Sequence, residues 1–527
     1  GRQGADRPQL RRERLFLLPG DSPAGLRLPL GSLAPSPMPA PWLDEPAAAD
    51  PRVDPDPDDD DAQPRRPGAT PLPAGAGVRT ALCVECRGDA LYVFVPPVGR
   101  FADFVALVGA LERAAAAVGV TPRIEGYPPP PSPEARRFAV TPDPGVLEVN
   151  RRPTANAADD VAELTAIYDA AIHAGLSAER HLLDGRLVGS GGGHHITLGG
   201  PTPLASPLLA RPAILASLLT FVQHHPALSY AFTGLFVGPT SQAPRVDEAR
   251  HDALYELELA LARLHAEPPP PPWMVDALLR NLLVDVAGST HRTEICIDKL
   301  FDSQTPYGRQ GLVELRAFEM PPHPRLAATQ ILLVRALVAA LAVAPYQAPL
   351  QRWGTQLHDR FLLPYWLGRD LDDVRAYLAR VGVDLPAAAL APFVELRCPL
   401  VGTLGAGDVT LEVRNALEPW PVLGDEVTHA GTARFVDSSL ERIELRARGL
   451  VPGRHVVVCG GAVVPMHVVP DDAVAVGGVR LRAWCPPHAL QPHLGIHHPL
   501  RIEVVDAWAR RSLGGCTYHV WHPEGRA

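Results

Sequence analysis

The apolar residues of this chain recur with two different periods between about residue 79 and residue 390. Alternation with a period of two predicts strands, and spacing of three to four predicts helices. The predicted strands are 80–86, 90–95, a short one around Ile124, 146–149, 194–198, 291–297 and 312–318, and the predicted helices are one at 104–111, one from Asp159, 207–223, 247–264, 273–285 and one from about 325. Because strands alternate with helices but a hairpin also occurs, the sequence predicts an α+β fold rather than a doubly wound parallel sheet.

The pattern changes at about residue 391 to short alternating strands separated by turn residues. Examples of these strands are 409–413, 443–445 and 456–458. This pattern of short strands and turns predicts a separate β-sandwich-like domain over residues 391–527.

The N-terminal residues 1–78 are rich in proline, alanine and aspartate and carry six aspartates between 54 and 61. This acidic run lacks the glycine and the distal glutamate of a calcium loop, so a largely disordered linker is the simpler interpretation. The sequence therefore predicts a linker at 1–78, a catalytic domain at 79–390 and a β-rich accessory domain at 391–527.

Composition restricts the chemistry of the protein. Lysine occurs once, at Lys299, so 48 of the 49 basic residues are arginine, and any step that needs a lysine has one candidate. No glycine-rich loop ends in Lys-Ser or Lys-Thr, which excludes a phosphate-loop nucleotide site. The net charge is −9, of which residues 41–80 supply −5, and the rest of the chain has no basic field for nucleic acid.

The cysteines and the hydrophobic segments indicate the compartment. Seven cysteines scattered over 527 residues argue against a disulfide scaffold and favour a reducing compartment. The N-terminus has no apolar signal core, and the longest apolar helix, near 327–344, is interrupted by Arg335. We expect a soluble, cytoplasmic protein without a membrane partner. Because an initiator methionine is absent, we also expect the chain to be part of a longer protein.

Single glutamates stand in the middle of four apolar strands, at Glu85, Glu125, Glu148 and Glu314. A buried carboxylate is costly unless it is paired or metal-bound. Each glutamate alone is explained by exposure on a half-buried strand, but the four together favour a shared cation site if their strands share a sheet. Strand geometry also places Glu314 and Arg316 on one face, with their apolar neighbours on the other. Oxygen ligands suit Mg²⁺ or Mn²⁺, and Mn²⁺ also accepts imidazole.

A glycine-rich run, Gly189-Ser190-Gly191-Gly192-Gly193, precedes His194 and His195. Glycines at 191, 192 and 193 would let backbone amides approach a phosphate, and a histidine there could bind a metal or that phosphate. The alternative is a tight loop with no ligand. The run is not a dinucleotide-binding fingerprint, because a strand pattern rather than a helix follows it.

Three arginines, Arg245, Arg292 and Arg316, have side chains suited to phosphate or carboxylate. Each alone is also explained by a structural ion pair, for example Arg245 with Asp247 or Glu248. Together with the acids and histidines they describe a site for metal-bound polyphosphate.

Other motifs give weaker evidence for a functional site. Cys83 and Cys86 have redox-type spacing, but on a strand they face opposite sides. Cys516, His519 and His522 lack a fourth zinc ligand, and no nucleophile elbow is present.

Three runs resemble a family of uncharacterised bacterial proteins described as amidoligases, which is grouped with glutamine synthetase and glutamate–cysteine ligase. The runs are Gly189 to His195, Leu235 to Asp252 and Val313 to Pro322. The resemblance implies a glutamine synthetase-like domain, an antiparallel sheet with packed helices, and an upstream transglutaminase-like domain in the full-length protein.

The resemblance also implies roles for individual residues. Glu85, Glu125, Glu148, His195 and Glu314 would bind Mg²⁺ or Mn²⁺, with His195 favoured over His194. Arg292 and Arg316 would be catalytic and would bind the phosphates of ATP together with the glycines at 191–193. Arg245 would bind a substrate carboxylate.

The hypothesis that follows is an ATP-dependent carboxylate–amine ligase acting through an acyl phosphate on a small-molecule or peptide substrate pair. One alternative is a non-catalytic binding or scaffold module that serves an upstream transglutaminase-like peptidase domain. Another is a zinc-dependent hydrolase built on His194, His195 and neighbouring acids.

Overall fold

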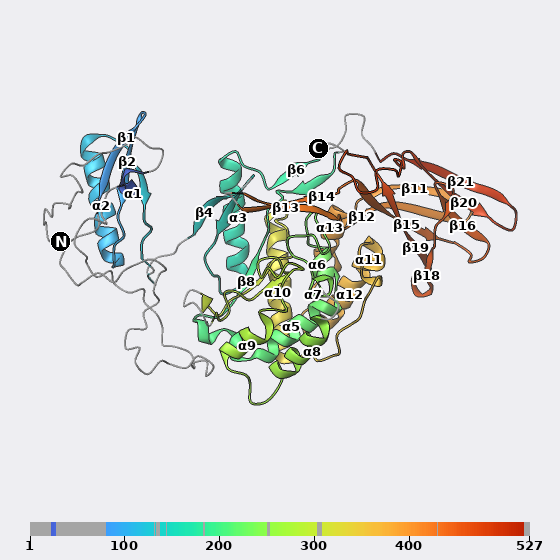
Figure 1. The fold of residues 1–527 in the computed structure, drawn as a ribbon, viewed down its shortest axis with the longest axis horizontal. Coiled ribbons are helices and arrows are strands. Elements are labelled where there is room, and N and C mark those ends of the chain that lie inside the picture. Colours follow the sequence, from blue (N-terminus) through green and yellow to red (C-terminus); the bar gives the residue numbers. More distant parts are fainter. Residues whose placement is uncertain are drawn as a thin grey trace. The chain divides into compact units, whose positions relative to one another are not determined.

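The computed structural model describes residues 23–27, 81–130, 132, 138–143, 145–182, 185–249, 253–302, 308–428 and 431–520 (Figure 1). The chain divides into two compact units. Unit 1 comprises Gly1–Glu45, Asp54–Ala139 and Val149–Arg152, and unit 2 comprises Pro46–Val53, Val140–Glu148 and Pro153–Ala527. Apart from residues 23–27, the predicted linker at 1–78 lies outside the described residues. Helices and strands are mixed, which confirms the α+β class.

Unit 1 contains a three-stranded sheet and one long helix. Its elements are α1 (Ala24–Arg27), β1 (Cys83–Arg87), β2 (Ala90–Val95), α2 (Phe101–Val118) and β3 (Arg123–Gly126). β1 and β2 form the predicted hairpin, and β3 pairs parallel to β2 after the α2 crossover. Gly25 in α1 lies against Phe94, where a Cβ atom would be 2.2 Å from the ring, so only glycine allows this contact.

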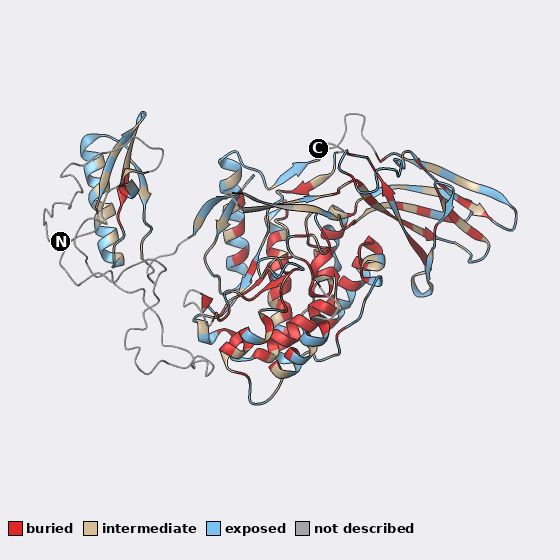
Figure 2. Cartoon of the chain, in the orientation of Figure 1, coloured by how far each residue is buried: buried red, intermediate tan, exposed pale blue. Residues whose placement is uncertain are grey.

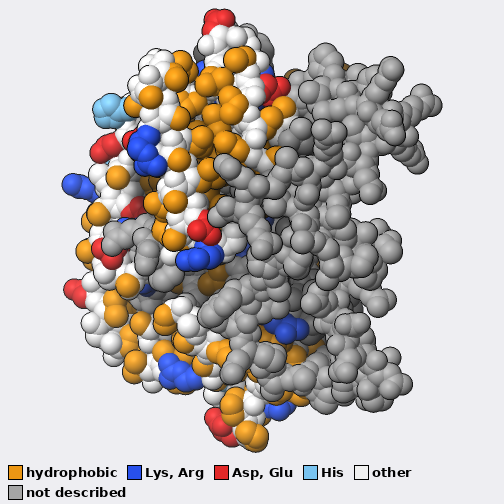
Figure 3. Space-filling view, turned by 90° about the vertical axis from the view of Figure 1, so that its left-hand side faces the viewer, with side chains coloured by type: hydrophobic (Ala, Val, Ile, Leu, Met, Phe, Trp, Pro, Cys, Tyr) orange, Lys and Arg blue, Asp and Glu red, His pale blue; other side chains and the backbone are white. Residues whose placement is uncertain are grey.

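The hydrophobic core of unit 1 is small. Among its described residues, Val93, Phe94 and Val95 are the buried hydrophobic ones, and α2 has no buried residue. Figure 3, viewed from the left-hand side of Figure 1, shows hydrophobic side chains gathered on the surface between single charged ones. The exposed hydrophobic residues of unit 1 include Leu82, Val84, Val105, Val118, Val120, Ile124, Tyr127 and Phe138. A unit of this size buries little apolar surface of its own.

Unit 2 begins with short paired strands and a helical body. The strands up to residue 315 are β4 (Ala139–Asp143), β5 (Val146–Asn150), β6 (Glu179–His181), β7 (Leu187–Gly189), β8 (Ile196–Leu198), β9 (Ile295–Cys296) and β10 (Val313–Leu315). The helices are α3 (Ala157–His173), α4 (Pro207–Ala210), α5 (Pro212–His224), α6 (Ala227–Tyr230), α7 (Val246–Ala249), α8 (Ala253–Leu264), α9 (Pro272–Leu279), α10 (Pro324–Val343), α11 (Gln356–Phe361), α12 (Pro364–Arg380) and α13 (Ala387–Arg397), with a 3-10 turn at Pro203–Ala205.

Buried residues concentrate in these helices (Figure 2). One large hydrophobic cluster runs from Leu164 to Leu417 and includes most of α5 and α10. α10 is long and apolar enough to cross a membrane by length and composition, but half of its apolar window is buried inside the protein. Its place in this cluster is that of a core helix.

Several elements are shorter than the sequence predicts. The predicted strands 291–297 and 312–318 are paired only at Ile295–Cys296 and Val313–Leu315, and the helix predicted at 273–285 ends at Leu279. Ile297, Phe318 and Leu283 are nevertheless buried. The spacing of apolar residues along the chain indicates which side chains are buried, but not whether they lie in a paired strand or in a turn.

The C-terminal part of unit 2 consists of antiparallel strands. They are β11 (Leu400–Ala406), β12 (Val409–Ala416), β13 (Val422–Thr428), β14 (Gly431–Val436), β15 (Leu440–Arg448), β16 (His455–Cys459), β17 (Ala462–Val463), β18 (His467–Val469), β19 (Val474–Arg482), β20 (Leu500–Asp506) and β21 (Arg511–Tyr518), with a 3-10 turn at Pro470–Asp472. A five-stranded sheet, β11-β12-β15-β19-β18, and a four-stranded sheet, β17-β16-β20-β21, share one hydrophobic cluster. Two sheets around a common core are the arrangement of a β-sandwich.

Candidate functional site

Four charged or titratable side chains meet on the open face of the antiparallel sheet β8-β10-β9. Glu314 lies at the centre of β10 and is opposite Thr197 on β8 and Cys296 on β9. Val313 and Leu315 point into the hydrophobic core, as the strand alternation predicts. Glu314 and Arg316 therefore share the other face, with His195 just before β8 and Lys299 in the turn after β9.

The distances define a connected group, which we call the Glu314 quartet. Oε1 of Glu314 lies 3.0 Å from Nδ1 of His195 and accepts a hydrogen bond of 2.8 Å from Arg316. Oε2 accepts a hydrogen bond of 3.1 Å from Nζ of Lys299. The side chains of His195 and Lys299 are 38% and 49% exposed, whereas that of Glu314 is 7% exposed. The quartet thus has a buried acid and a face that solvent reaches.

The charge of Glu314 is stabilised by its neighbours. Burial alone would raise the pKa of this carboxyl, but the hydrogen bond from His195 and the charges of Arg316 and Lys299 outweigh burial and lower the pKa to about 2. The carboxylate is therefore ionised at neutral pH and accepts the Nδ1 proton of His195. This leaves Nε2 of His195 as the ring atom that can accept a proton or bind a ligand when the ring is neutral. Nε of Arg316 is buried and has no hydrogen-bond acceptor among the described residues.

The glycine run lies directly beside His195. A Cβ atom at Gly193 would come within 2.3 Å of Nε2 of His195, so this position must be glycine for the ring to pack there. Gly191 has a φ of +90°, and a Cβ atom there would lie 3.1 Å from the Arg180 guanidinium. The backbone of Gly192 accepts a hydrogen bond of 2.9 Å from Met320. The loop is thus a support for His195 as well as a turn.

The two consecutive histidines have different surroundings. His194 faces helix α10, where its Nδ1 lies 2.5 Å from Oε1 of Gln330, and its backbone N–H donates to Phe318. His195 faces Glu314 on the open side. The structure therefore places His195 in the quartet, and His194 contacts the helical core.

Glu148 is exposed on β5. This strand comes close to the glycine run, because a Cβ atom at Gly192 would lie 3.6 Å from the side chain of Val146. The described contacts do not join Glu148 to the quartet, so its predicted role as a metal ligand stays a prediction.

Glu85 and Glu125 belong to unit 1, where both are paired with Arg87. Nε of Arg87 lies 3.3 Å from Oε2 of Glu85, and its terminal nitrogen pairs with Glu125. Oε2 of Glu85 also accepts a hydrogen bond of 3.1 Å from the backbone N–H of Ala24 at the start of α1. The ring of Tyr92 packs against the same guanidinium, 3.6 Å from its centre.

The residues described do not fit a protein-held metal centre in either unit. Among them, no group of three or more His, Cys, Asp or Glu side chains is placed to hold a metal ion. A cation at Glu85 and Glu125 would have to displace Arg87, and one at Glu314 would have to displace Lys299 and Arg316. Glu85 and Glu125 lie in unit 1, and Glu148, His195 and Glu314 lie in unit 2, so the predicted shared cation site stays a prediction. In unit 2, the quartet has two cationic side chains around one carboxylate.

The substrate-binding role predicted for Arg245 does not fit its position. Its side chain is fully buried, and its five N–H groups donate to the Asp247 carboxylate, the Ser229 hydroxyl and the backbone carbonyls of Val222 and Gln223. Glu294 lies 3.6 Å away. Arg245 therefore has no free donor for a ligand. The run from Leu235 to Asp252 therefore contributes Arg245 to a buried network of ion pairs and hydrogen bonds, as the alternative of a structural ion pair predicts. Residues 250–252 of this run lie outside the described residues.

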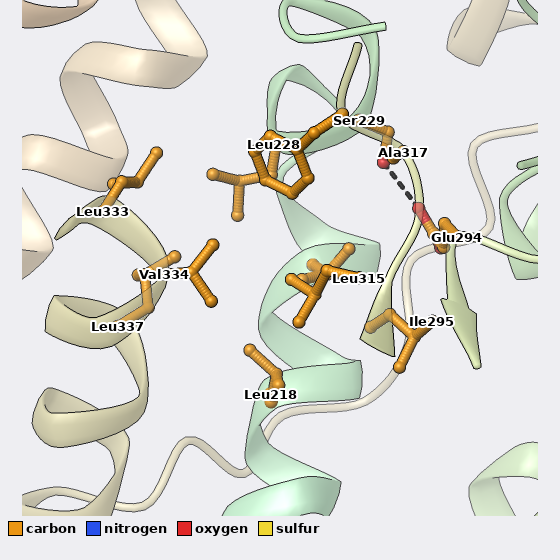
Figure 4. A pocket seen from close by; sticks show the side chains of 12 residues that line it. Leu218, Leu228, Ser229, Glu294, Ile295, Leu315, Ala317, Leu333, Val334 and Leu337 are labelled. Carbon is orange, nitrogen blue, oxygen red and sulfur yellow. Dashed lines mark hydrogen bonds between the residues drawn. The ribbon is translucent and has the colours of Figure 1, made fainter. Parts of the chain in front are cut away.

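A small void adjoins this buried network (Figure 4). It measures about 10 Å³ and is lined mainly by apolar side chains. Ser229 and Glu294 lie at one side, where the hydroxyl donates a hydrogen bond of 2.5 Å to the carboxylate. Burial raises the pKa of Glu294 to about 7 despite the charge of Arg245. A void of this size is at the lower limit for one water molecule, so it is not a substrate site.

Arg292 is half-buried in the turn before β9. Its side chain makes no hydrogen bond or ion pair with another residue that the structure describes, so its phosphate-binding role stays a prediction. The weaker motifs remain without support. The seven cysteines are free, and His522 lies outside the described residues.

Sequence reasoning does not assign two residues to this region. Lys299 is identified as the one candidate for a step that needs a lysine, but it is not placed beside Glu314, and Glu319 is missed. Glu319 lies between the glycine run and Gly234, and its carboxyl carbon would be 3.3 Å from a Cβ atom at Gly189 or Gly234. Burial raises the pKa of Glu319, whereas Arg397 and Arg180 lower it. The sequence contains little evidence for a role of Glu319, because this residue lies four positions after an apolar strand and not within it.

Comparison with known proteins identifies the family. No curated protein and no solved structure matches the chain. One family model, described as "Putative amidoligase enzyme (DUF2126)", matches residues 3–527. This match covers nearly the whole sequence, and the chain therefore belongs to this amidoligase family.

Proposed function

We propose that this protein is an ATP-dependent ligase that joins a carboxylate to an amine through an acyl phosphate, and that the Glu314 quartet is its phosphate-handling centre. The observation that carries the proposal is the placement of two cations and a histidine around one ionised carboxylate on a face open to solvent. The family description, an amidoligase, supports the same reaction class.

Arg316 and Lys299 would bind the phosphoryl oxygens. Arg316 supports this role because its buried Nε lacks an acceptor among the described residues. Lys299 supports it because its ammonium is half-exposed and can move from Glu314 to a ligand. Positive groups aimed at the transferred phosphoryl group are the main source of catalysis in such reactions. Glu314 would hold both cations in place while no ligand is bound.

His195 would act as the proton acceptor. Because Nδ1–H of His195 donates a hydrogen bond to Glu314, its Nε2 can take a proton from the attacking amine. Gly193 keeps the space beside Nε2 free of a side chain.

The reaction would proceed in two balanced steps. An oxygen of the substrate carboxylate attacks the γ-phosphorus of ATP, the bond to the β,γ-bridging oxygen breaks, and ADP leaves. The amine then attacks the acyl carbon, the carbon–oxygen bond to phosphate breaks, and the amine proton passes to Nε2 of His195. The products are an amide, ADP and inorganic phosphate. ATP would enter as its Mg²⁺ or Mn²⁺ complex, so we assign the predicted cation to the substrate.

The test is release of ADP by the full chain with Mg²⁺-ATP and pooled amino acids or peptides, some carrying ¹⁸O in their carboxylates. The proposal expects ADP only when both a carboxylate and an amine are present, and one ¹⁸O atom in each phosphate released. Binding of ATP without turnover across a broad panel would favour the scaffold alternative.

The matched variants are Arg316→Gln and Arg414→Gln. Both arginines pair with a glutamate two residues earlier on a strand, but Arg414 lies in the β-sandwich and pairs with Glu395 and Glu412. Arg316→Gln should lower turnover about 100-fold, whereas Arg414→Gln should leave it unchanged. Equal turnover of the two variants would remove Arg316 from the site.

A further inference from the structure

A second cavity lies within unit 2, where the helical body meets the β-sandwich. Its volume is about 140 Å³, and it shares no residue with the Glu314 quartet. Arg186, Leu235 and Arg397 line it from the helical side. Strands β12 and β15 and the loops beside the β-sandwich strands line the opposite side, and these loops carry Trp420, Ser438 and Trp484. Ligand sites favour such junctions between two packed parts of a protein.

The wall on the β-sandwich side contains two indole rings, those of Trp420 and Trp484, together with aliphatic and polar residues. Both indole N–H groups are used internally, since Trp420 donates to the Leu440 carbonyl at 2.9 Å and Trp484 donates to the Ser438 carbonyl at 3.2 Å. The tryptophans therefore offer ring surface rather than donors to the cavity. A volume of about 140 Å³ is close to that of an engineered cavity of roughly 150 Å³ that binds benzene.

The other side of the cavity carries a guanidinium with a spare donor. Arg397, the last residue of α13, donates from its terminal nitrogen to the Gly234 carbonyl, while its Nε is buried without an acceptor among the described residues. Burial lowers the pKa of Arg397, Glu319 raises it, and the nearby Arg186 lowers it. A buried donor on a charged group is costly to leave unpaired. An anion in the cavity would supply the acceptor.

The acids in the wall do not supply this acceptor. Glu418 is held by Arg442 at 2.9 Å and by Arg480 at 2.6 Å. Neither acid of the wall accepts a hydrogen bond from Nε of Arg397. The cavity therefore combines an aromatic, ring-sized compartment with a cationic end.

We propose that this cavity binds a small carboxylate whose apolar body is about the size of one six-membered ring, with the carboxylate at Arg397 and the body between Trp420 and Trp484. The site goes beyond the ligase function proposed above and does not depend on it, because binding is measured without ATP or turnover.

The test is isothermal titration calorimetry of the full chain with benzoate, and with benzamide as the uncharged molecule of the same shape. We expect saturable binding of one benzoate per chain and at least about tenfold weaker binding of benzamide, because a charge-assisted hydrogen bond contributes about 1.5–3 kcal/mol. Equal affinity for the two compounds, or no saturable binding of benzoate, would overturn the proposal. Tighter binding of inorganic phosphate than of benzoate would overturn the assignment to a carboxylate.

Three variants locate the binding. Arg397→Gln should weaken benzoate binding about tenfold or more. Ser438→Phe fills the cavity from the turn before β15, keeps the three arginines of its wall and should abolish binding even if Arg397→Gln fails to fold. Arg352→Gln removes an exposed arginine that pairs with Glu258 elsewhere in unit 2, and it should bind like the wild type. Unchanged binding by Ser438→Phe would place benzoate outside this cavity.

Discussion

Two Glu-x-Arg pairs in unit 2 share one geometry but have opposite surroundings. Directly after β10, Arg316 donates to Glu314 of that strand at 2.8 Å, and in β15, Arg446 donates to Glu444 at 2.7 Å. Both glutamates lie on a central strand of an antiparallel sheet. Glu314 has His195 and Lys299 as further partners on an open face, whereas Glu444 is 0% exposed and its other oxygen accepts the backbone N–H of Tyr365.

The protonation equilibria follow these surroundings. The pKa of Glu314 is lowered to about 2, because three cationic or donating partners outweigh burial. The pKa of Glu444 is raised, because burial outweighs Arg446. The Glu444 carboxylate holds the first turn of α12 against the sandwich, and Arg446 packs over the ring of Tyr365. The same sequence pattern therefore forms a charged site in one sheet. In the other sheet it forms a contact between Glu444 and the first turn of α12, which we call the structural joint.

The largest expected effect is on stability at the structural joint. Glu444→Ala removes the fully buried carboxylate that pairs with the half-buried Arg446, and it removes the acceptor for the Tyr365 backbone N–H. We expect the free energy of unfolding to fall by about 3–5 kcal/mol, the usual cost of breaking a buried pair. Urea denaturation measures this loss. A loss below about 1 kcal/mol, as for an exposed pair, would contradict the role of Glu444 as a joint.

The pH dependence of stability should have opposite signs at the two pairs. Glu314 has a folded pKa of about 2 against an ordinary 4.5, so its ionisation adds about 3 kcal/mol above pH 4.5, and this is lost as pH falls toward 2. Glu444 has a raised folded pKa, so its contribution decreases as pH rises above its ordinary value of 4.5. Unfolding free energies of wild type minus Glu314→Gln, and of wild type minus Glu444→Gln, measured from pH 3 to 6.5, should slope in opposite directions. Parallel slopes would contradict this difference.

The next effect is on the proton transfer assigned to His195. His195→Gln keeps a polar side chain beside Glu314 but removes the base, so we expect turnover to fall about 100-fold. His194→Gln is the matched control, since His194 contacts Gln330 in the core. His194→Gln should keep turnover near the wild-type level. Equal turnover of His195→Gln and His194→Gln would assign the base elsewhere.

The smallest effect is expected at Lys299. Its side chain is half-exposed, so Lys299→Gln should change the free energy of unfolding by less than about 1 kcal/mol. It should raise the KM for ATP about tenfold with a smaller change in kcat, because one phosphate contact is lost. An unchanged KM would remove the lysine from the phosphate site.

Much of the quartet could be predicted from the sequence. Alternation around Glu314 places it beside Arg316 on one face of a strand, and the glycine run before a strand pattern singles out the neighbouring histidines. Lys299 could not be placed, because it comes close to Glu314 through the β9-β10 pairing and the turn after β9. Pairing partners are tertiary information that spacing along the chain does not contain.

Arg245, Glu85 and Glu125 show the limits of reading residue types. The local sequence of Arg245 offers Asp247 as a partner, but it does not indicate that Ser229 and the carbonyls of Val222 and Gln223 accept the remaining hydrogen bonds. The alternation around Glu85 and Glu125 predicts strands correctly, but it does not indicate that they form a unit of their own with Arg87 between them. The predicted domain boundaries at residues 79 and 391 stay predictions, and the division near residue 139 has no counterpart in the hydrophobic pattern.

The most direct measurement is ADP release, per folded molecule, by Glu314→Gln and Glu444→Gln under the same conditions. Both changes remove one carboxylate charge from a Glu-x-Arg pair and keep the shape of the side chain. We predict that Glu444→Gln keeps wild-type turnover and that Glu314→Gln loses about 100-fold, with both variants folded by circular dichroism. Equal turnover of the two variants would contradict the claim that the Glu314 quartet is the active centre.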